Sequence, residues 1–140
     1  MNAPTFAITR VVFGENGFVE FTNTSTEAAD PDGLNACQFP SYPPLPGGEL
    51  QPGESVRIEA SQFGGLKADD GEVGLYLEPA WEDPDAIIGY VQWGSEDHKR
   101  SPVAVDAGVW ESGTAVSAAG SSELRAAAAT QSPGGWEVVA

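Results

Sequence analysis

Short apolar runs, separated by clusters of Gly, Pro, Asp and Asn, constrain the fold of this chain more than any other feature. Up to residue 117 the apolar residues do not recur at helical spacing, and in several runs they alternate with polar residues. Alternation puts successive side chains on opposite faces, as in a strand, and the turn-forming residues mark where strands end. We therefore expect an all-β fold of about nine strands, a number typical of a two-sheet β-sandwich.

The clearest expected feature is a hairpin near the N-terminus. Asn16-Gly17 favours a tight turn and lies between the runs 5–13 and 18–21. Residues 86–93 form the most hydrophobic run, which predicts the buried central strand of a sheet. The remaining strands are expected at residues 34–39, 55–60, 73–77, 103–105, 114–117 and 136–139.

The length predicts one domain. We expect it to span residues 1–140, with a core over about residues 5–139. Residues 118–133 depart from the strand pattern, because the Ala-rich stretch 122–131 has high helix propensity. That stretch is too short for a stable isolated helix and has no apolar stripe to anchor it. We therefore expect residues 118–133 to be a mobile loop with one helical turn.

The chain is strongly acidic. It has 21 Asp and Glu residues against 6 Lys and Arg residues, which gives a formal net charge of −15. Nucleic acid and anionic lipid attract basic surfaces, so we expect no nucleic-acid partner. The absence of an apolar run of about 18 residues predicts no membrane insertion. The N-terminal residues also lack the pattern of a secretion signal.

Two acidic loops are the candidate cation sites, and calcium is the one cofactor that their chemistry would fit. Calcium takes about six to eight oxygen ligands, often from acids around a Gly turn. Neither loop has the spacing of an EF-hand, so solvated turns are the alternative interpretation. Trp81 lies between acidic residues and is a candidate for stacking on a sugar ring. The candidate metal ligands are Asp69, Asp70, Glu72, Glu82, Asp83 and Asp85.

One loop comes nearest to a catalytic set. It contains Ser95 and His98, the single histidine of the chain, with two acids between them. A serine hydrolase needs its nucleophile on a sharp turn and a positioned imidazole. The sequence around Ser95 is not the Gly-x-Ser-x-Gly elbow, and a spacing of three residues rarely aligns nucleophile and base. We therefore predict no catalytic residues and a non-enzymatic protein.

Four segments in order resemble a known family. They are GFVEFTN at 17–23, LQPGESV at 50–56, GEVGLY at 71–76 and IIGYVQWG at 87–94. This order resembles the lamin-tail domain of bacterial type, an immunoglobulin-like β-sandwich found in nuclear lamins and in many bacterial secreted or surface proteins. The chain departs from that pattern at residues 31–34, which read PDGL where the family often has Leu-Ser-Gly-Trp.

The resemblance implies an immunoglobulin-like sandwich that acts as a structural or protein-interaction module, with a protein partner held at strand edges or loops. It also favours an extracytoplasmic or secreted location. The alternative is a calcium- or carbohydrate-binding accessory domain, which an exposed Trp81 beside liganded acidic loops would favour. The nucleic-acid binding of nuclear lamin tails is not carried over, because the net charge of −15 opposes it.

Overall fold

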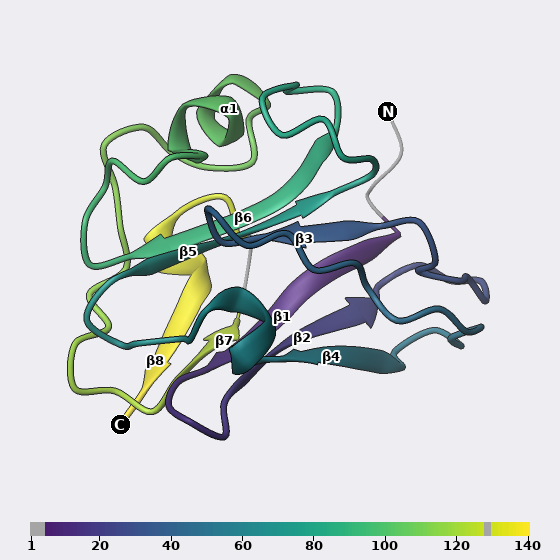
Figure 1. The fold of residues 1–140 in the computed structure, drawn as a ribbon, viewed down its shortest axis with the longest axis horizontal. Helices are drawn as coiled ribbons and strands as arrows, with labels where there is room; N and C mark the ends of the chain where they lie inside the picture. Colours follow the sequence, from purple (N-terminus) through teal and green to yellow (C-terminus); the bar gives the residue numbers. More distant parts are fainter. Residues whose placement is uncertain (1–4, 128–129) are drawn as a thin grey trace.

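A computed structural model describes residues 5–127 and 130–140 (Figure 1). Over these residues the chain is mostly β, with eight strands in two antiparallel sheets and one α-helix. This agrees with the all-β prediction and gives one strand fewer than the expected nine or so. In the same ranges, no helix has the length and apolar character needed to cross a membrane.

The larger sheet has five strands in the order β4-β2-β1-β7-β8. The predicted N-terminal hairpin is confirmed, since β1 and β2 pair antiparallel with Val12 opposite Phe18. Its turn differs from the expectation, because the residue with positive φ is Gly14, at 102°, and not Asn16. The strand bounds are β1 Phe6–Val12, β2 Phe18–Asn23, β4 Ser55–Glu59, β7 Glu123–Ala126 and β8 Trp136–Val139.

The smaller sheet has three strands in the order β3-β5-β6, with bounds β3 Asn35–Cys37, β5 Gly71–Tyr76 and β6 Ile87–Trp93. The prediction that residues 86–93 form the central strand is wrong. The central strand is β5, all of whose residues are buried. β6 lies at the edge, where helix α1 (Ser101–Asp106) packs beside it and Val116 bonds to its end. This cover explains why an edge strand is so hydrophobic.

Two expected strands are not formed. Residues 103–105 belong to α1, whose first turn contains Pro102, a residue that suits the start of a helix. Residues 114–117 contribute a single parallel bridge, between Val116 and Trp93. The short 3₁₀ helices η1 (Ala60–Phe63) and η2 (Pro133–Gly135) complete the described elements.

The expectation of a loop with one helical turn at residues 118–133 is wrong for residues 123–126, which form β7. Leu124 is fully buried there and pairs with Val11 of β1 and Val138 of β8. Burial between two strands outweighs the helix propensity of the neighbouring alanines. Residues 128–129 of this stretch and residues 1–4 of the expected domain lie outside the described residues.

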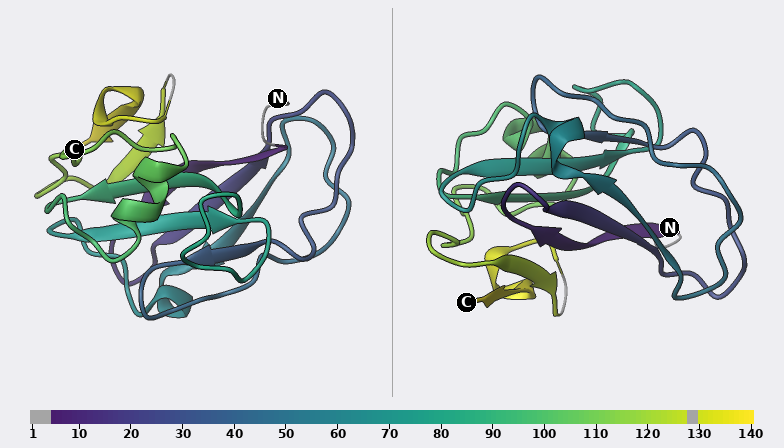
Figure 2. Two further views of the ribbon diagram at one scale, coloured as in Figure 1. Left: turned by 90° about the horizontal axis from the view of Figure 1, so that it is seen from above. Right: turned by 60° about the horizontal axis from the view of Figure 1, so that its bottom comes forward.

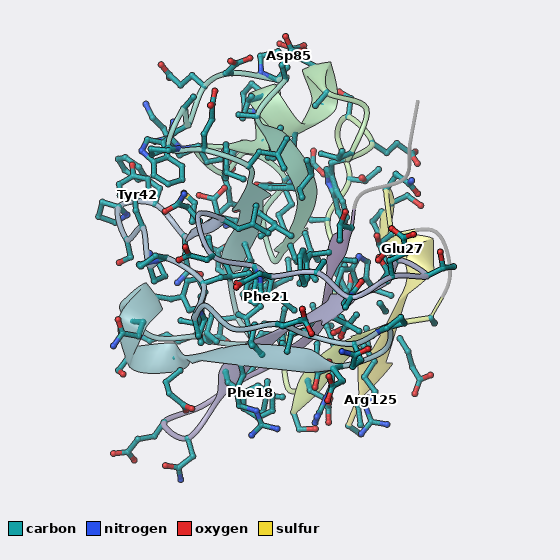
Figure 3. All side chains as sticks on the ribbon, turned by 90° about the vertical axis from the view of Figure 1, so that its right-hand side faces the viewer. Phe18, Phe21, Glu27, Tyr42, Asp85 and Arg125 are labelled. Atoms are coloured by element: carbon teal, nitrogen blue, oxygen red, sulfur yellow. The ribbon has the colours of Figure 1, made fainter. Side chains whose placement is uncertain are left out.

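The core lies between the two sheets, which face each other in Figure 2. Side chains of both sheets belong to one buried cluster, and β1 contacts β6 across it. Figure 3 shows Phe21 inside this layer, with Phe18 and Arg125 on the outer face of the five-stranded sheet. Burying each large apolar side chain contributes about 1.5–3 kcal/mol. Members with less than 2% exposure include Val11, Val19, Phe21, Val73, Leu75, Val91, Trp93 and Leu124.

Candidate functional site

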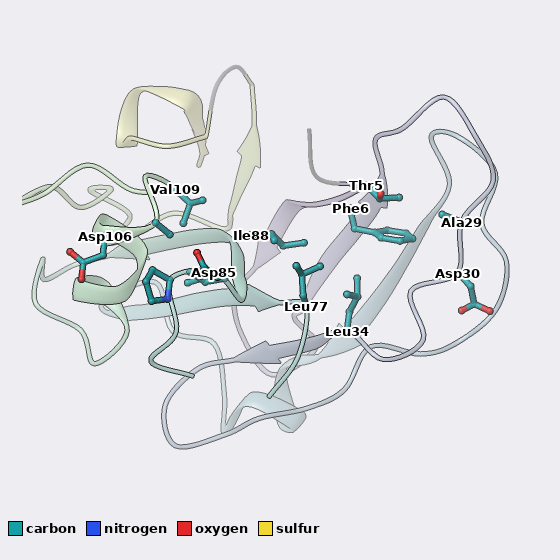
Figure 4. A pocket seen from close by; sticks show the side chains of 13 residues that line it. Thr5, Phe6, Ala29, Asp30, Leu34, Leu77, Asp85, Ile88, Asp106 and Val109 are labelled. Atoms are coloured by element: carbon teal, nitrogen blue, oxygen red, sulfur yellow. The ribbon is translucent and has the colours of Figure 1, made fainter. Parts of the chain in front are cut away.

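A groove of about 740 Å³ opens beside the starts of β1 and β6 (Figure 4). Its apolar walls come from segments far apart in the sequence: Phe6 begins β1, Leu77 follows β5, and Ile88 lies in β6. Leu34 and Val109 complete these walls. The groove is rimmed by Asp30, Asp85 and Asp106, and we call it the acid-rimmed groove.

Leu77 is the residue that most distinguishes this groove. It is 51% exposed, although it directly follows the fully buried strand β5. Only two other large hydrophobic residues in the described ranges are exposed to a similar degree, Phe39 and Val138. A concave apolar surface with a polar rim is typical of a site that binds a ligand or a partner.

At Asp30, backbone hydrogen bonds stabilise the ionised form of a rim carboxylate. The Asp30 carboxylate accepts hydrogen bonds from the backbone N–H groups of Gly48 and Asp32, each at 2.9 Å. These bonds lower the pKa of Asp30 below its usual value. No Lys, Arg or His is among the described residues that line the groove, so the groove carries uncompensated negative charge.

A second, shallower hollow of about 450 Å³ is lined by Trp81, and we call it the Trp81 hollow. Trp81 is half-buried, and not as exposed as the sequence suggested. The Tyr42 ring stacks 4.4 Å from its ring, and the Tyr76 hydroxyl donates to its carbonyl at 2.9 Å. The polar side chains of this hollow are Glu82, Asp83, Lys99 and Arg100.

Arg100 is a buried residue of the Trp81 hollow that is not among the site residues predicted from the sequence. Its side chain is 6% exposed, its Nη2 donates to the Tyr42 hydroxyl at 2.7 Å, and its Nε has no hydrogen-bond partner. The Glu82 carboxylate lies 3.8 Å from its Nη1. The adjacent pair Lys99-Arg100, in a chain with six basic residues, is the sequence signal that could have indicated this position.

The first acidic loop does not converge on one point. The buried Glu72 carboxylate accepts hydrogen bonds from the Tyr90 hydroxyl at 2.8 Å and the Arg100 backbone N–H at 3.1 Å. Asp70 instead accepts bonds from the backbone N–H and the hydroxyl of Ser95, at 2.9 and 2.8 Å. No bond is formed by the Asp69 side chain in the described part of the chain.

The second acidic loop is divided in the same way. Asp83 accepts a hydrogen bond from the backbone N–H of Asp85 at 2.8 Å, which shapes the turn. Asp85 lines the acid-rimmed groove, whereas Glu82 and Asp83 line the Trp81 hollow. Across residues 5–127 and 130–140, no three His, Cys, Asp or Glu side chains form a group that could hold a metal ion. A cation site at these loops therefore stays a prediction.

Ser95 and His98, in the loop after β6, lie close to Asp70. These are the residue types of a serine-hydrolase triad, but their arrangement differs from that of a triad. His98 Nε2 lies 3.1 Å from Asp70 Oδ1 and 3.4 Å from Ser95 Oγ, while its Nδ1 lies 3.0 Å from Gln92 Oε1. In a catalytic triad the serine and the acid bond to opposite ring nitrogens. Here they share Nε2, and the Ser95 hydroxyl donates to Asp70. The contacts fasten this loop to β6.

Electrostatic effects in this region follow from burial and hydrogen bonding. Partial burial alone would raise the pKa of Asp70, but the bonds from Ser95 and the contact with His98 together lower it. Burial raises the pKa of the Cys37 thiol to about 12, and the nearby Glu72 adds to this effect. Cys37 is therefore held as a buried, protonated side chain.

Comparisons with known proteins give no relative for this chain: no protein-family model matches the sequence, and neither a curated protein nor a solved structure matches it.

Proposed function

We propose that this chain is a non-enzymatic interaction module, built as an immunoglobulin-like sandwich of lamin-tail type, that binds a protein partner in the acid-rimmed groove. The observation that carries the proposal is Leu77, half of whose surface is exposed inside a concave apolar site. Complete burial of a leucine side chain contributes about 1.5–3 kcal/mol, so a partner that covers this residue gains a substantial part of that energy.

The remaining walls support the same conclusion. Ile88 and Val109 are half-buried in the free chain, so a bound segment would remove further apolar surface from water. The groove is large enough for several side chains of a peptide, since binding sites of small ligands have volumes of about 300–1,000 Å³. Leu77, Ile88 and Val109 come from separate segments and line the same groove, so a partner bound there would contact all three.

A selection from a library of random peptides displayed on phage tests this proposal. Peptides enriched on the wild-type protein are synthesised with a fluorescent label, and their affinities are measured by anisotropy against Leu77→Asp and Val138→Asp. Val138 is a matched control because it is 44% exposed and lies on β8. We expect Leu77→Asp to weaken binding more than about tenfold and Val138→Asp to leave it unchanged. Enriched peptides that bind both variants equally well would contradict the proposal.

A carbohydrate-binding accessory domain is the second candidate, because Trp81 lines a hollow together with charged side chains that can bond to sugar hydroxyls. A glycan array probed with the wild type, Glu82→Ala and Lys99→Ala tests it. The second candidate requires glycan binding that both variants lose and that Leu77→Asp retains. Absence of glycan binding by the wild type would exclude it.

A further inference from the structure

The three rim carboxylates of the acid-rimmed groove lack cationic partners within the described chain. The ion pairs of the described residues involve Glu20, Glu123, Asp70 and Glu82, and none involves Asp30, Asp85 or Asp106. Asp106 also ends helix α1, where the backbone carbonyl groups carry partial negative charge. An acid at a helix C-terminus is locally unfavourable, so the fold itself gains nothing from this charge.

None of the six Lys and Arg residues lines the acid-rimmed groove. Arg10 and Arg125 bond to Glu123 on the five-stranded sheet, and Arg57 lies 3.9 Å from the Phe18 ring centre on the same sheet. Lys99 and Arg100 line the Trp81 hollow. A cation that neutralises the rim would therefore have to come with the partner.

The rim charges are distributed along the groove. In Figure 4, Asp30 lies at one end beside Ala29, and Asp106 lies at the other end beside Val109. Phe6, Leu34 and Leu77 lie between these ends. The complementary ligand has an apolar middle and a cationic group on each side of it.

We propose that the occupant of the acid-rimmed groove is an extended peptide segment in which Lys or Arg residues flank a run of aliphatic residues. This inference rests on the proposed function and names the class of partner. An extended chain suits the site because it can place aliphatic side chains on the apolar floor and send long basic side chains to both ends. Opposite charges at the rim also speed the encounter and exclude acidic segments.

Self-association is a poorer fit to the same groove. Two copies each carry a net charge of −15, so their approach is opposed by long-range repulsion. A basic segment of another protein is attracted instead, because its charge is opposite to the net negative charge of this chain. The proposal therefore predicts binding that weakens as salt is added.

The peptides obtained by the phage selection described above test this inference through their composition. We expect enrichment of sequences with Lys or Arg on both sides of aliphatic residues. The affinity of the best peptide is then measured against the triple variant Asp30→Asn, Asp85→Asn, Asp106→Asn. We expect a loss of about tenfold, equivalent to about 1.4 kcal/mol, and a several-fold loss between about 0.05 and 0.5 M NaCl.

A second triple variant controls for the change in overall charge. Glu15→Gln, Glu59→Gln and Glu137→Gln are exposed positions outside the groove lining, and both triple variants change the net charge from −15 to −15 + 3 = −12. We expect the control variant to keep at least half of the wild-type affinity. A rim-specific loss therefore separates local contacts from the general field of the protein.

The outcomes separate this inference from the proposed function. Enriched peptides that depend on Leu77 but are neutral or acidic would overturn the basic-flank proposal and leave the groove as the binding site. Equal losses in the two triple variants would also overturn it, because the charge effect would then not belong to the rim. A set of enriched peptides without dependence on Leu77 would overturn both, as would a Leu77-dependent dimer of the chain with no enriched peptide.

Discussion

Replacing Gly94 by alanine tests how tightly the end of β6 is packed against the first acidic loop. Gly94 directly follows β6 and has a φ of 83°, a conformation that L side chains rarely adopt. A Cβ atom at this position would overlap the carbonyl oxygen of Asp69 and lie 2.8 Å from the Cα of Asp70. Both obstacles are backbone atoms, so a change of rotamer cannot relieve them.

The expected loss of stability has two parts. Holding an alanine in the left-handed region costs about 1–2 kcal/mol, and forcing atoms into an occupied space costs about 1–3 kcal/mol more. We therefore expect Gly94→Ala to lower the free energy of unfolding by about 2–5 kcal/mol. Gly113→Ala is the matched control, because Gly113 has a φ of 69° but its Cβ would have no atom within 4 Å. The control should lose only the first part.

Urea unfolding followed by tryptophan fluorescence gives the free energies of the wild type and both variants. The informative quantity is the difference between the two variants, since the conformational cost of alanine cancels in it. We expect Gly94→Ala to be less stable than Gly113→Ala by at least about 1 kcal/mol. Equal losses in the two variants would refute the close approach of β6 to the Asp69 backbone.

Three further predictions follow from the structure. Hydrogen bonds from Arg125 and Arg10 lower the pKa of Glu123 from its ordinary 4.5 to about 2, so their stabilisation is present above pH 4.5 and is lost as the pH falls toward 2. Solvent weakens the ion pair, because the Arg125 side chain is half-exposed. Acid unfolding curves should therefore show that the free energy of unfolding of the wild type falls by about 1–2 kcal/mol more than that of Glu123→Gln between about pH 5 and pH 2. Gln92 donates to the Thr114 carbonyl at 2.9 Å and its Oε1 lies 3.0 Å from His98 Nδ1, so urea unfolding of Gln92→Met should show a loss of about 2–3 kcal/mol, and an unchanged stability would contradict this network. Cys37 is fully buried and its pKa is raised to about 12, so a thiol reagent at about pH 8 should react with it only as fast as the chain opens, and rapid labelling of the native protein would disprove this protection.

The parts of the fold that could be predicted are those fixed by neighbouring residues. The β1–β2 hairpin follows from a turn between two apolar runs, and β4 follows from the alternation of Val56 and Ile58 with polar residues. β7 could not be predicted in this way, because its identity depends on the burial of Leu124 between strands from both ends of the chain. Long-range pairing overrides a local preference for helix.

The acid-rimmed groove was less accessible to sequence analysis than the fold. Its walls come from β1, β6 and the segments before β3, after β5 and after α1, and no local pattern reports that these segments meet. The exposed Leu77 ends the apolar run 73–77, which the sequence pattern predicts to be strand along its whole length. The sequence pattern makes Asp85 a candidate metal ligand, which stays a prediction, whereas its place in the lining of the groove could be known only from the fold.

The position of β1 between β2 and β7 has a consequence for the order of events during synthesis. The edge of β1 that faces away from β2 is paired only when β7 is in place. The hydrogen bond between Arg10 and Glu123 joins residues that are far apart in the sequence. Until β7 has emerged from the ribosome, β1 offers unpaired backbone groups beside the apolar Val11. A nascent chain in that state is open to pairing with other strands, so a chaperone or rapid completion of translation would protect it from aggregation.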